Sequence, residues 1–267
     1  MQYKLIAMDL DGTLNSDEKK ITPRTREALM AAQNRGIRLV LASARPSPGL
    51  FKERDILRLQ DHGGILMSYN GGRIVNAGTG RVLFETAMGR EAARACLQFL
   101  EKLPVTPILD DGVRFYVTDP LGYKVSYECE NNRMECTQVD NLADFLCFDP
   151  IKILMSVQPE CLPEVQEIIR KALPENLTVV QTAPFYLEII PKIINKGQGL
   201  RDVCAALGID PAETIAFGDA ANDIPMLQAA GLGVAMGNAQ EAVKQAADQV
   251  TDTNNRDGIA KLLEAII

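Results

Sequence analysis

The chain alternates short, mostly apolar runs with longer segments in which apolar residues recur every three or four positions. Three of the short runs end abruptly in small polar or acidic residues: 5–8, 37–42 and 215–217. Short apolar runs are typical of parallel strands buried on both faces of a sheet, and the longer pattern is typical of amphipathic helices. Their alternation predicts strand–helix–strand units with right-handed crossovers, and therefore an α/β protein with a parallel sheet.

Helix boundaries support this interpretation. Thr22 has the side chain of an N-cap residue, Pro23 suits the first helical position, and Gly36 ends the segment. A later helix runs to Leu207 and is closed by Gly208. A further strand is expected at 232–236 and a helix at 239–247. A doubly wound sheet accounts for both ends of the chain.

The pattern changes in the middle of the chain. Helices are expected there at 90–103 and 159–173, and short strands at 106–109, 113–118, 151–157, 177–181 and 185–190. Hairpins joined by helices indicate an α+β module on a largely antiparallel sheet. Because the strand–helix rhythm resumes afterwards, we expect a core formed by residues 1–85 and 185–267, with residues 86–184 as an inserted domain.

Composition narrows the class of protein. The net charge of −7 argues against a nucleic-acid backbone as a general partner, and no apolar run approaches the length of a membrane span. The chain starts directly in a strand, without the pattern of a signal peptide. The six cysteines are scattered without a CxxC pair. We therefore expect a cytoplasmic protein that binds neither nucleic acid nor membrane. Its oligomeric state is open between a monomer and a homodimer.

Histidine contributes little to the candidate chemistry. His62 is the only histidine and stands in a polar loop, where we expect a solvated side chain, and His-rich zinc sites are excluded by count. Neither a GxGxxG fingerprint nor a GxxxxGK[ST] loop occurs in the chain. The candidate chemistry therefore rests on carboxylates.

Asp9 and Asp11 follow the first apolar run, Leu5–Met8. Because they are two positions apart, both side chains leave the strand end on the same side. Two carboxylates that close repel each other unless a cation lies between them. Gly12 permits a sharp turn, and Thr13 can hydrogen-bond to the loop. The pattern indicates a hard-cation site, most simply for Mg²⁺, although a surface Asx turn would use the same residues.

Three further positions carry candidate chemistry. Ser43 follows the second apolar run and could donate a hydrogen bond to an anion, although an ordinary loop serine has the same sequence context. Lys196 stands at a helix start, where its charge opposes the helix dipole. A phosphate contact would explain that position, and a solvated lysine is the alternative. The third run ends in Gly218-Asp219-Ala220-Ala221-Asn222-Asp223, a second strand that stops on carboxylates.

Taken in order, these motifs resemble the four motifs of the haloacid dehalogenase (HAD) superfamily: Asp9-x-Asp11-Gly12-Thr13, Ser43, Lys196 and Gly218-Asp219-x-x-Asn222-Asp223. The insertion has the position of that family's type C2 cap. Similarity to the Cof-type IIB branch, the sugar phosphatases, is carried by Asn70-Gly71, Asn195-Lys196-Gly197 and 233–239. The family commonly has Thr-Gly-Arg where this chain has Ser43-Ala44-Arg45, so the hydroxyl is kept and the glycine is not.

The resemblance implies a doubly wound, Rossmann-like core with an inserted α+β cap. It also implies an Mg²⁺-dependent phosphatase that hydrolyses small phosphate monoesters of metabolites, such as sugar phosphates, through an aspartyl-phosphate. In such an enzyme Asp9 is the nucleophile and Asp11 the general acid and base. The metal would be held by Asp9, the backbone carbonyl of Asp11 and Asp219, with Asp223 supporting the site. The phosphoryl oxygens would be bound by Ser43, Lys196 and Asn222.

Two alternatives share the same fold. A phosphomutase of the superfamily would return the phosphoryl group to a sugar instead of to water, and isomer formation would reveal it. A non-catalytic sugar-phosphate-binding protein would bind without turnover. The presence of both Asp9 and Asp11 argues against the second alternative.

Overall fold

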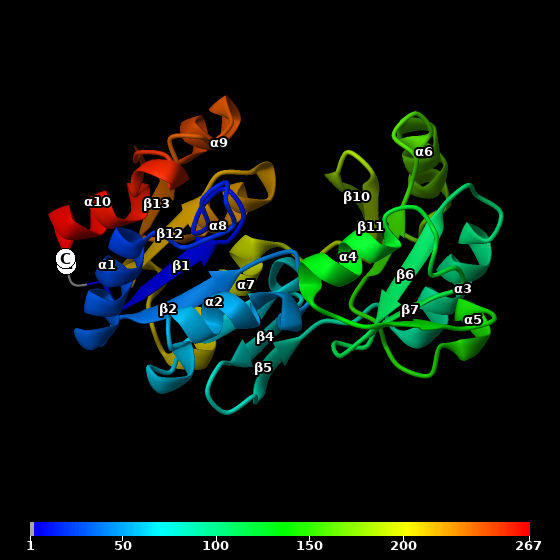
Figure 1. Cartoon of the computed structure of the whole chain (residues 1–267), viewed down its shortest axis with the longest axis horizontal. Coiled ribbons are helices and arrows are strands. Elements are labelled where there is room, and N and C mark those ends of the chain that lie inside the picture. Colours follow the sequence, from blue (N-terminus) through cyan, green and yellow to red (C-terminus); the bar gives the residue numbers. More distant parts are fainter. Residues whose placement is uncertain (1–2) are drawn as a thin grey trace. The chain divides into compact units, whose positions relative to one another are not determined.

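The computed structural model describes residues 3–267, which form two compact units (Figure 1). The first unit contains the chain up to Glu85 together with Asn195–Ile267. The second unit is the intervening segment, Thr86–Ile194. Each unit has a sheet and a hydrophobic core of its own.

The first unit is built on an eight-stranded sheet in the order β14-β13-β12-β1-β2-β3-β4-β5. Strand β1 (Leu5–Asp9) lies in its middle and pairs in parallel with β12 (Thr214–Gly218) and β2 (Arg38–Ala42). The remaining strands are β3 (Ile65–Ser68), β4 (Arg73–Asn76), β5 (Val82–Glu85), β13 (Leu232–Ala235) and β14 (Gln249–Val250). Among the described strands of this sheet, only the β3–β4 and β4–β5 pairs are antiparallel. The predicted parallel sheet is therefore confirmed, and a hairpin formed by β4 and β5 extends it.

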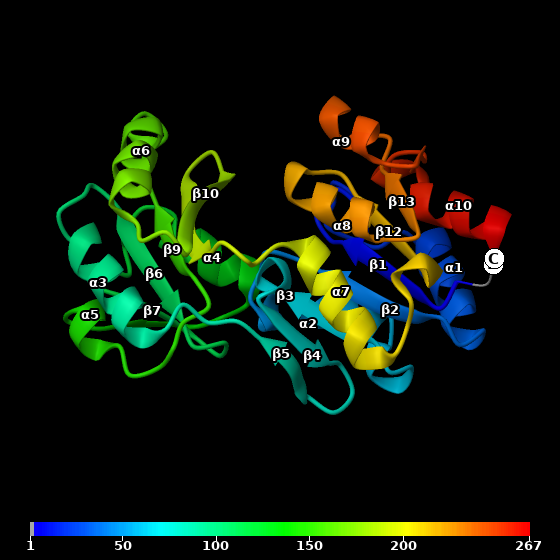
Figure 2. The ribbon, with the colours of Figure 1, turned by 180° about the vertical axis from the view of Figure 1, so that it is seen from behind.

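Helices cover both faces of this sheet because successive residues of a buried strand point to opposite sides. Ile6 and Met8 belong to the core under α1 (Pro23–Asn34) and α10 (Gly258–Ile266). Leu5 and Ala7 belong to the core under α7 (Lys196–Leu207), α8 (Ile224–Ala229) and α9 (Glu241–Ala246). Figure 2 shows α7 and α8 in front of the strands, and Figure 1 shows α1 beside α10.

Short helices complete the loops of this unit: η1 (Ser47–Leu50), α2 (Phe51–Ile56), η2 (Leu59–Asp61), η3 (Tyr69–Gly71), η4 (Pro211–Glu213), η5 (Ala221–Asp223) and η6 (Asn254–Arg256). The N-cap of α1 is formed as predicted, since the Thr22 side chain accepts a hydrogen bond from the amide of Thr25. The connections from β1 to β2 and from β12 to β13 leave β1 and β12 in opposite directions. The crevice at the carboxyl ends of these two strands is therefore the expected ligand-binding position of the fold.

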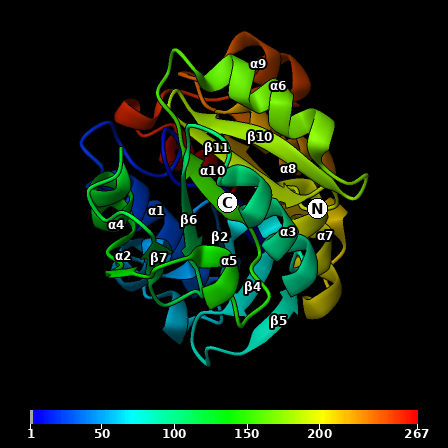
Figure 3. The ribbon, with the colours of Figure 1, turned by 90° about the vertical axis from the view of Figure 1, so that its right-hand side faces the viewer.

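The second unit has a six-stranded sheet, whose order is β10-β11-β9-β6-β7-β8. Its strands are β6 (Thr106–Asp110), β7 (Phe115–Val117), β8 (Cys136–Gln138), β9 (Ile153–Ser156), β10 (Leu177–Ala183) and β11 (Tyr186–Pro191). All pairs except β7–β8 are antiparallel, as expected for an α+β module. One face packs against α3 (Arg90–Leu100), α5 (Leu142–Phe145) and α6 (Leu162–Ala172), and α4 (Val125–Asn132) contributes to the core on the other (Figure 3).

The expected second boundary of the insertion, between residues 184 and 185, was wrong. Strand β11 pairs with β10 and with β9, and the second unit extends to Ile194. Every residue of β11 is buried, so its sequence resembles a strand of the parallel core. Only its long-range pairing assigns it to the antiparallel sheet.

Several elements were not predicted at all. The stretch 119–150 contains α4, β8 and α5, and the chain beyond residue 247 contains β14 and α10. Helix α4 is bounded by two residues with positive φ, Lys124 and Arg133, instead of by the usual capping residues. Among residues 3–267, no helix has the length and apolar composition needed to cross a bilayer.

Candidate active site

Asp9 is the last residue of β1, and the loop after it is shaped by Gly12. Gly12 has φ +83°, a conformation that residues with a Cβ rarely adopt. A Cβ at this position would lie 2.4 Å from Oδ2 of Asp219, which follows β12. The hydroxyl of Thr13 donates a hydrogen bond of 2.6 Å to Oδ1 of the same Asp219. The motif that follows β1 therefore contacts the residue that follows β12, and holds the ends of these two strands close together.

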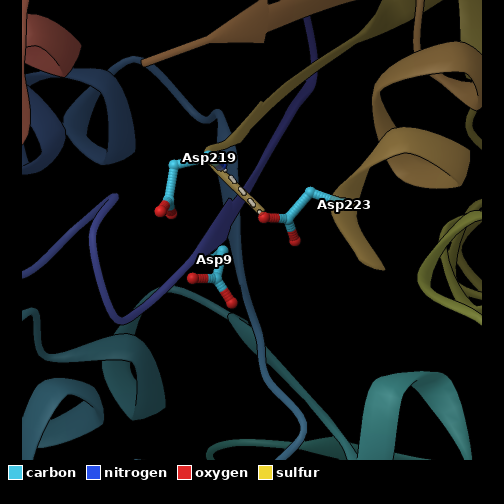
Figure 4. A group of neighbouring side chains, drawn as sticks. All are labelled: Asp9, Asp219 and Asp223. Carbon is cyan, nitrogen blue, oxygen red and sulfur yellow. Dashed lines mark hydrogen bonds between the residues drawn. The ribbon is translucent and has the colours of Figure 1, made fainter. Parts of the chain in front are cut away.

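Three carboxylates meet at these strand ends. Asp9, Asp219 and Asp223 each place an oxygen within 4.8 Å of the others (Figure 4). Burial raises the pKa of Asp9 to about 8, although Lys196 opposes the change, and Asp223 raises the pKa further. Burial also raises the pKa of Asp219. Such a group of carboxylates, two of them buried, has an excess of negative charge that a hard cation would offset, so the donor set fits Mg²⁺.

Lys196 is the cation of the cluster, and it is completely buried. Its Nζ lies 2.5 Å from Oδ1 of Asp9 and 2.6 Å from Oδ1 of Asp223. Burial alone would lower the pKa of this ammonium group, but Asp223 and Asp9 together raise the pKa above its ordinary value. The alternative of a solvated lysine is therefore wrong. The position at the first turn of α7 is explained by the carboxylates that the amine contacts.

Asp223 holds the loop after β12 in shape. Its Oδ2 accepts hydrogen bonds of 3.0 Å from the backbone amides of Asp219 and Ala220, and its Oδ1 accepts one from Lys196. Figure 4 shows the first of these bonds between the labelled residues. Both oxygens are thus already engaged, which favours a supporting role for Asp223 within the cluster.

The carboxylate of Asp11 lies outside this group. Oδ1 and Oδ2 of Asp11 accept hydrogen bonds of 2.8 and 2.6 Å from Nη2 of Arg45, and Oδ2 accepts a third of 3.1 Å from Nε. About half of the Asp11 side chain is exposed, whereas the Arg45 side chain is largely buried. The sequence did not identify Arg45 as a site residue. Its position two residues after Ser43 was the available signal, because the end of β2 lies beside the end of β1.

Asn70 joins Ser43 to Asn222. In the sequence, Asn70 was noted only for the similarity to the Cof-type branch. The amide of Asn70 donates a hydrogen bond of 2.8 Å to the backbone oxygen of Ser43. Oδ1 of Asn70 accepts one of 3.0 Å from Nδ2 of Asn222. Tyr69 and Asn70 both have positive φ, 52° and 56°, which is uncommon for residues with a side chain. This turn places two candidate phosphate-binding residues at the same edge of the sheet.

Comparison with known proteins decides the family. Residues 6–263 match the family model described as haloacid dehalogenase-like hydrolase. The chain belongs to this family. A solved structure of such a hydrolase from Bacteroides thetaiotaomicron superposes with a TM-score of 0.94, with 35% identity over 100% of both chains.

Two relatives in this family have names that specify a phosphatase. The 5-amino-6-(5-phospho-D-ribitylamino)uracil phosphatase YbjI of Escherichia coli is 30% identical over 275 residues, which cover 100% of this chain and 97% of the relative. The structure of the HAD subclass IIB sugar phosphatase BT4131 covers 98% of both chains, with 27% identity and a TM-score of 0.77. The chain is thus an HAD-type phosphatase, and the predicted family, fold class and enzyme class are confirmed.

Proposed function

We propose that this phosphatase hydrolyses small phosphate monoesters, in particular sugar phosphates, with Mg²⁺ and through a phosphorylated Asp9. The observation that supports this most strongly is the group of Asp9, Asp219 and Asp223, in which the buried Asp9 and Asp223 are both paired with Lys196. A sugar-phosphate substrate is further supported by the names of two relatives, one a sugar phosphatase and the other a phosphatase of a phosphorylated ribityl compound.

In the first half-reaction, a carboxylate oxygen of Asp9 attacks phosphorus, and the bond between phosphorus and the ester oxygen breaks. Asp11 gives a proton to the leaving oxygen, which departs as an alcohol. In the second half-reaction, Asp11 takes a proton from water, and the resulting hydroxide attacks the phosphorus on Asp9. Inorganic phosphate leaves, and the Asp9 carboxylate is restored.

The remaining residues would bind the phosphoryl group and the metal ion. Ser43, Asn222 and Lys196 would hold the phosphoryl oxygens, with Asn70 fixing the orientation of Asn222. Mg²⁺ would be held by Asp9, Asp219 and the backbone carbonyl of Asp11, and would offset the negative charge of nucleophile and phosphate. Asp223 would keep Lys196 and the Asp219 loop in place.

The insertion, residues 86–194, would act as the cap that selects the leaving group, which the type C2 position implies. We also place the protein in the cytoplasm as a monomer or homodimer, in accordance with its scattered cysteines.

A screen of phosphorylated metabolites for phosphate release tests this proposal. Activity should vanish when the metal is chelated and return with added Mg²⁺. Asp9→Asn should lower turnover by orders of magnitude, and intact mass under rapid quench should show no phosphorylated enzyme. Full activity in excess chelator would contradict the metal assignment. Isomer formation without phosphate release would point to a mutase, and binding without turnover would point to a sensor.

A further inference from the structure

Arg45 and Asp11 form a two-pronged ion pair at the edge of the candidate active site. Nη2 of Arg45 contacts both oxygens of the Asp11 carboxylate, at 2.8 and 2.6 Å, and Nε adds a contact of 3.1 Å. The planar guanidinium fixes the direction of a carboxylate as well as its distance, which a lysine ammonium group cannot do. The orientation of Asp11 is therefore defined by one neighbouring side chain.

The arginine is itself anchored to the loop after β2. Its backbone amide donates a hydrogen bond of 3.2 Å to Oγ of Ser43, and only 15% of its side chain is exposed. By contrast, 53% of the Asp11 side chain is exposed. A half-exposed carboxylate would populate several rotamers, and a largely buried arginine restricts them.

We propose that Arg45 is a positioning residue, which holds the Asp11 carboxylate in the orientation needed for proton transfer to and from the leaving group. The inference rests on the proposed function, because Asp11 is the acid and base only in that reaction. Arg45 would act through Asp11, because its guanidinium contacts both oxygens of that carboxylate. Without it, Asp11 is present but spends only part of its time in the productive direction.

The test compares two substrates that differ in their need for an acid. p-Nitrophenol leaves readily without protonation, whereas the alcohol of glycerol 2-phosphate requires it. We expect Arg45→Ala to lower kcat for glycerol 2-phosphate by about 10- to 100-fold, a part of the roughly 10²–10⁴-fold that an acid–base group provides. The loss on p-nitrophenyl phosphate should be several-fold smaller. Arg45→Lys keeps the charge without the fork and should show the same selectivity, which also covers the case of an Ala variant that fails to fold.

A double-mutant cycle separates this role from others. If Arg45 acts through Asp11, adding Arg45→Ala to Asp11→Asn should cause no further loss on either substrate. Losses that multiply, or an equal loss of both substrates in the single variant, would overturn the proposal and indicate a direct contact with phosphate. If Asp11→Asn leaves glycerol 2-phosphate hydrolysis intact, the acid–base step of the proposed function fails instead.

Arg24 provides a matched control in the same unit. Its Nε and Nη2 donate to the two oxygens of Glu264 at 2.9 and 2.6 Å, so the pair has the same forked geometry. It joins α1 to α10, and neither of its residues belongs to the loop that holds Asp11. Arg24→Ala should leave the ratio of the two rates unchanged. A change in that ratio equal to that of Arg45→Ala would show that loss of any forked pair produces the effect, and would overturn the proposal.

Discussion

Each unit buries a lysine against carboxylates, and the two lysines differ in what surrounds them. Lys196 lies at the carboxyl ends of parallel strands, between Asp9 and Asp223. Lys152 precedes β9 in the second unit, and its Nζ lies 2.6 Å from Oε1 of Glu188 on β11. The register pairs Glu188 with residue 154, so Lys152 is its diagonal neighbour on one face of the sheet.

The carboxylates of the second unit receive additional hydrogen bonds. Glu128, whose charge helps to raise the pKa of Lys152, accepts one of 2.8 Å from Nδ2 of Asn132. Asp110, which acts in the same direction, accepts one of 3.0 Å from the amide of Gly112. In the first unit, Asp219 and Asp223 also accept hydrogen bonds, but burial raises the pKa of Asp9 to about 8. A buried ion pair between a lysine and a carboxylate is thus not a sign of function by itself. Carboxylates whose charged form is disfavoured by burial, at the ends of adjacent strands, are such a sign.

If the two units fold separately, two deletions with different end points should have different outcomes. Replacing residues 86–194 by a short Gly-Ser linker should leave a folded core, because all eight strands of its sheet are retained. Removing only residues 86–184 should cause aggregation, because it leaves β11 without β9 and β10. Circular dichroism and size-exclusion chromatography measure both outcomes. Two proteins that fold equally well would place the boundary where the sequence first suggested.

The two lysines should respond differently to the same substitution. Lys196→Met removes the charge beside Asp9 and should lower kcat by at least about 10²–10³-fold. Lys152→Met leaves buried carboxylates without their cation and should lower the free energy of unfolding by about 3–5 kcal/mol. At a temperature where both variants are folded, Lys152→Met should keep near-normal kcat. Turnover and urea unfolding are the measurements, and an equal loss of kcat in both variants would remove the distinction.

Two glycines with nearly the same φ test the packing of the carboxylate cluster. Gly12 and Gly36 have φ +83° and +85°, but a Cβ at Gly36 would meet nothing within 4 Å. Gly12→Ala should lower kcat by about 10- to 100-fold, because the new methyl displaces Asp219. Gly36→Ala should cost only stability, about 1–2 kcal/mol of backbone strain. Equal activity of the two variants would show that Asp219 can move without consequence.

The sequence alone determined the local parts of this protein. Short apolar runs that end in Asp9, Ser43 and Asp219 carried enough information to predict parallel strands and the edge where they meet. The N-cap of α1 at Thr22 could also be predicted, because a capping side chain accepts hydrogen bonds from amides only a few residues away. Such features depend on period and on neighbours in the chain.

Long-range pairing decided the rest. A fully buried strand such as β11 can belong to a parallel or to an antiparallel sheet. Only its pairing with β9 showed to which unit it belongs. Likewise, nothing near Lys196 in the sequence shows that its amine lies between Asp9 and Asp223. The ion pair between Arg45 and Asp11 is equally invisible in the sequence. Charges separated along the chain become partners only when strand order brings their loops together, and that order is a property of the tertiary structure.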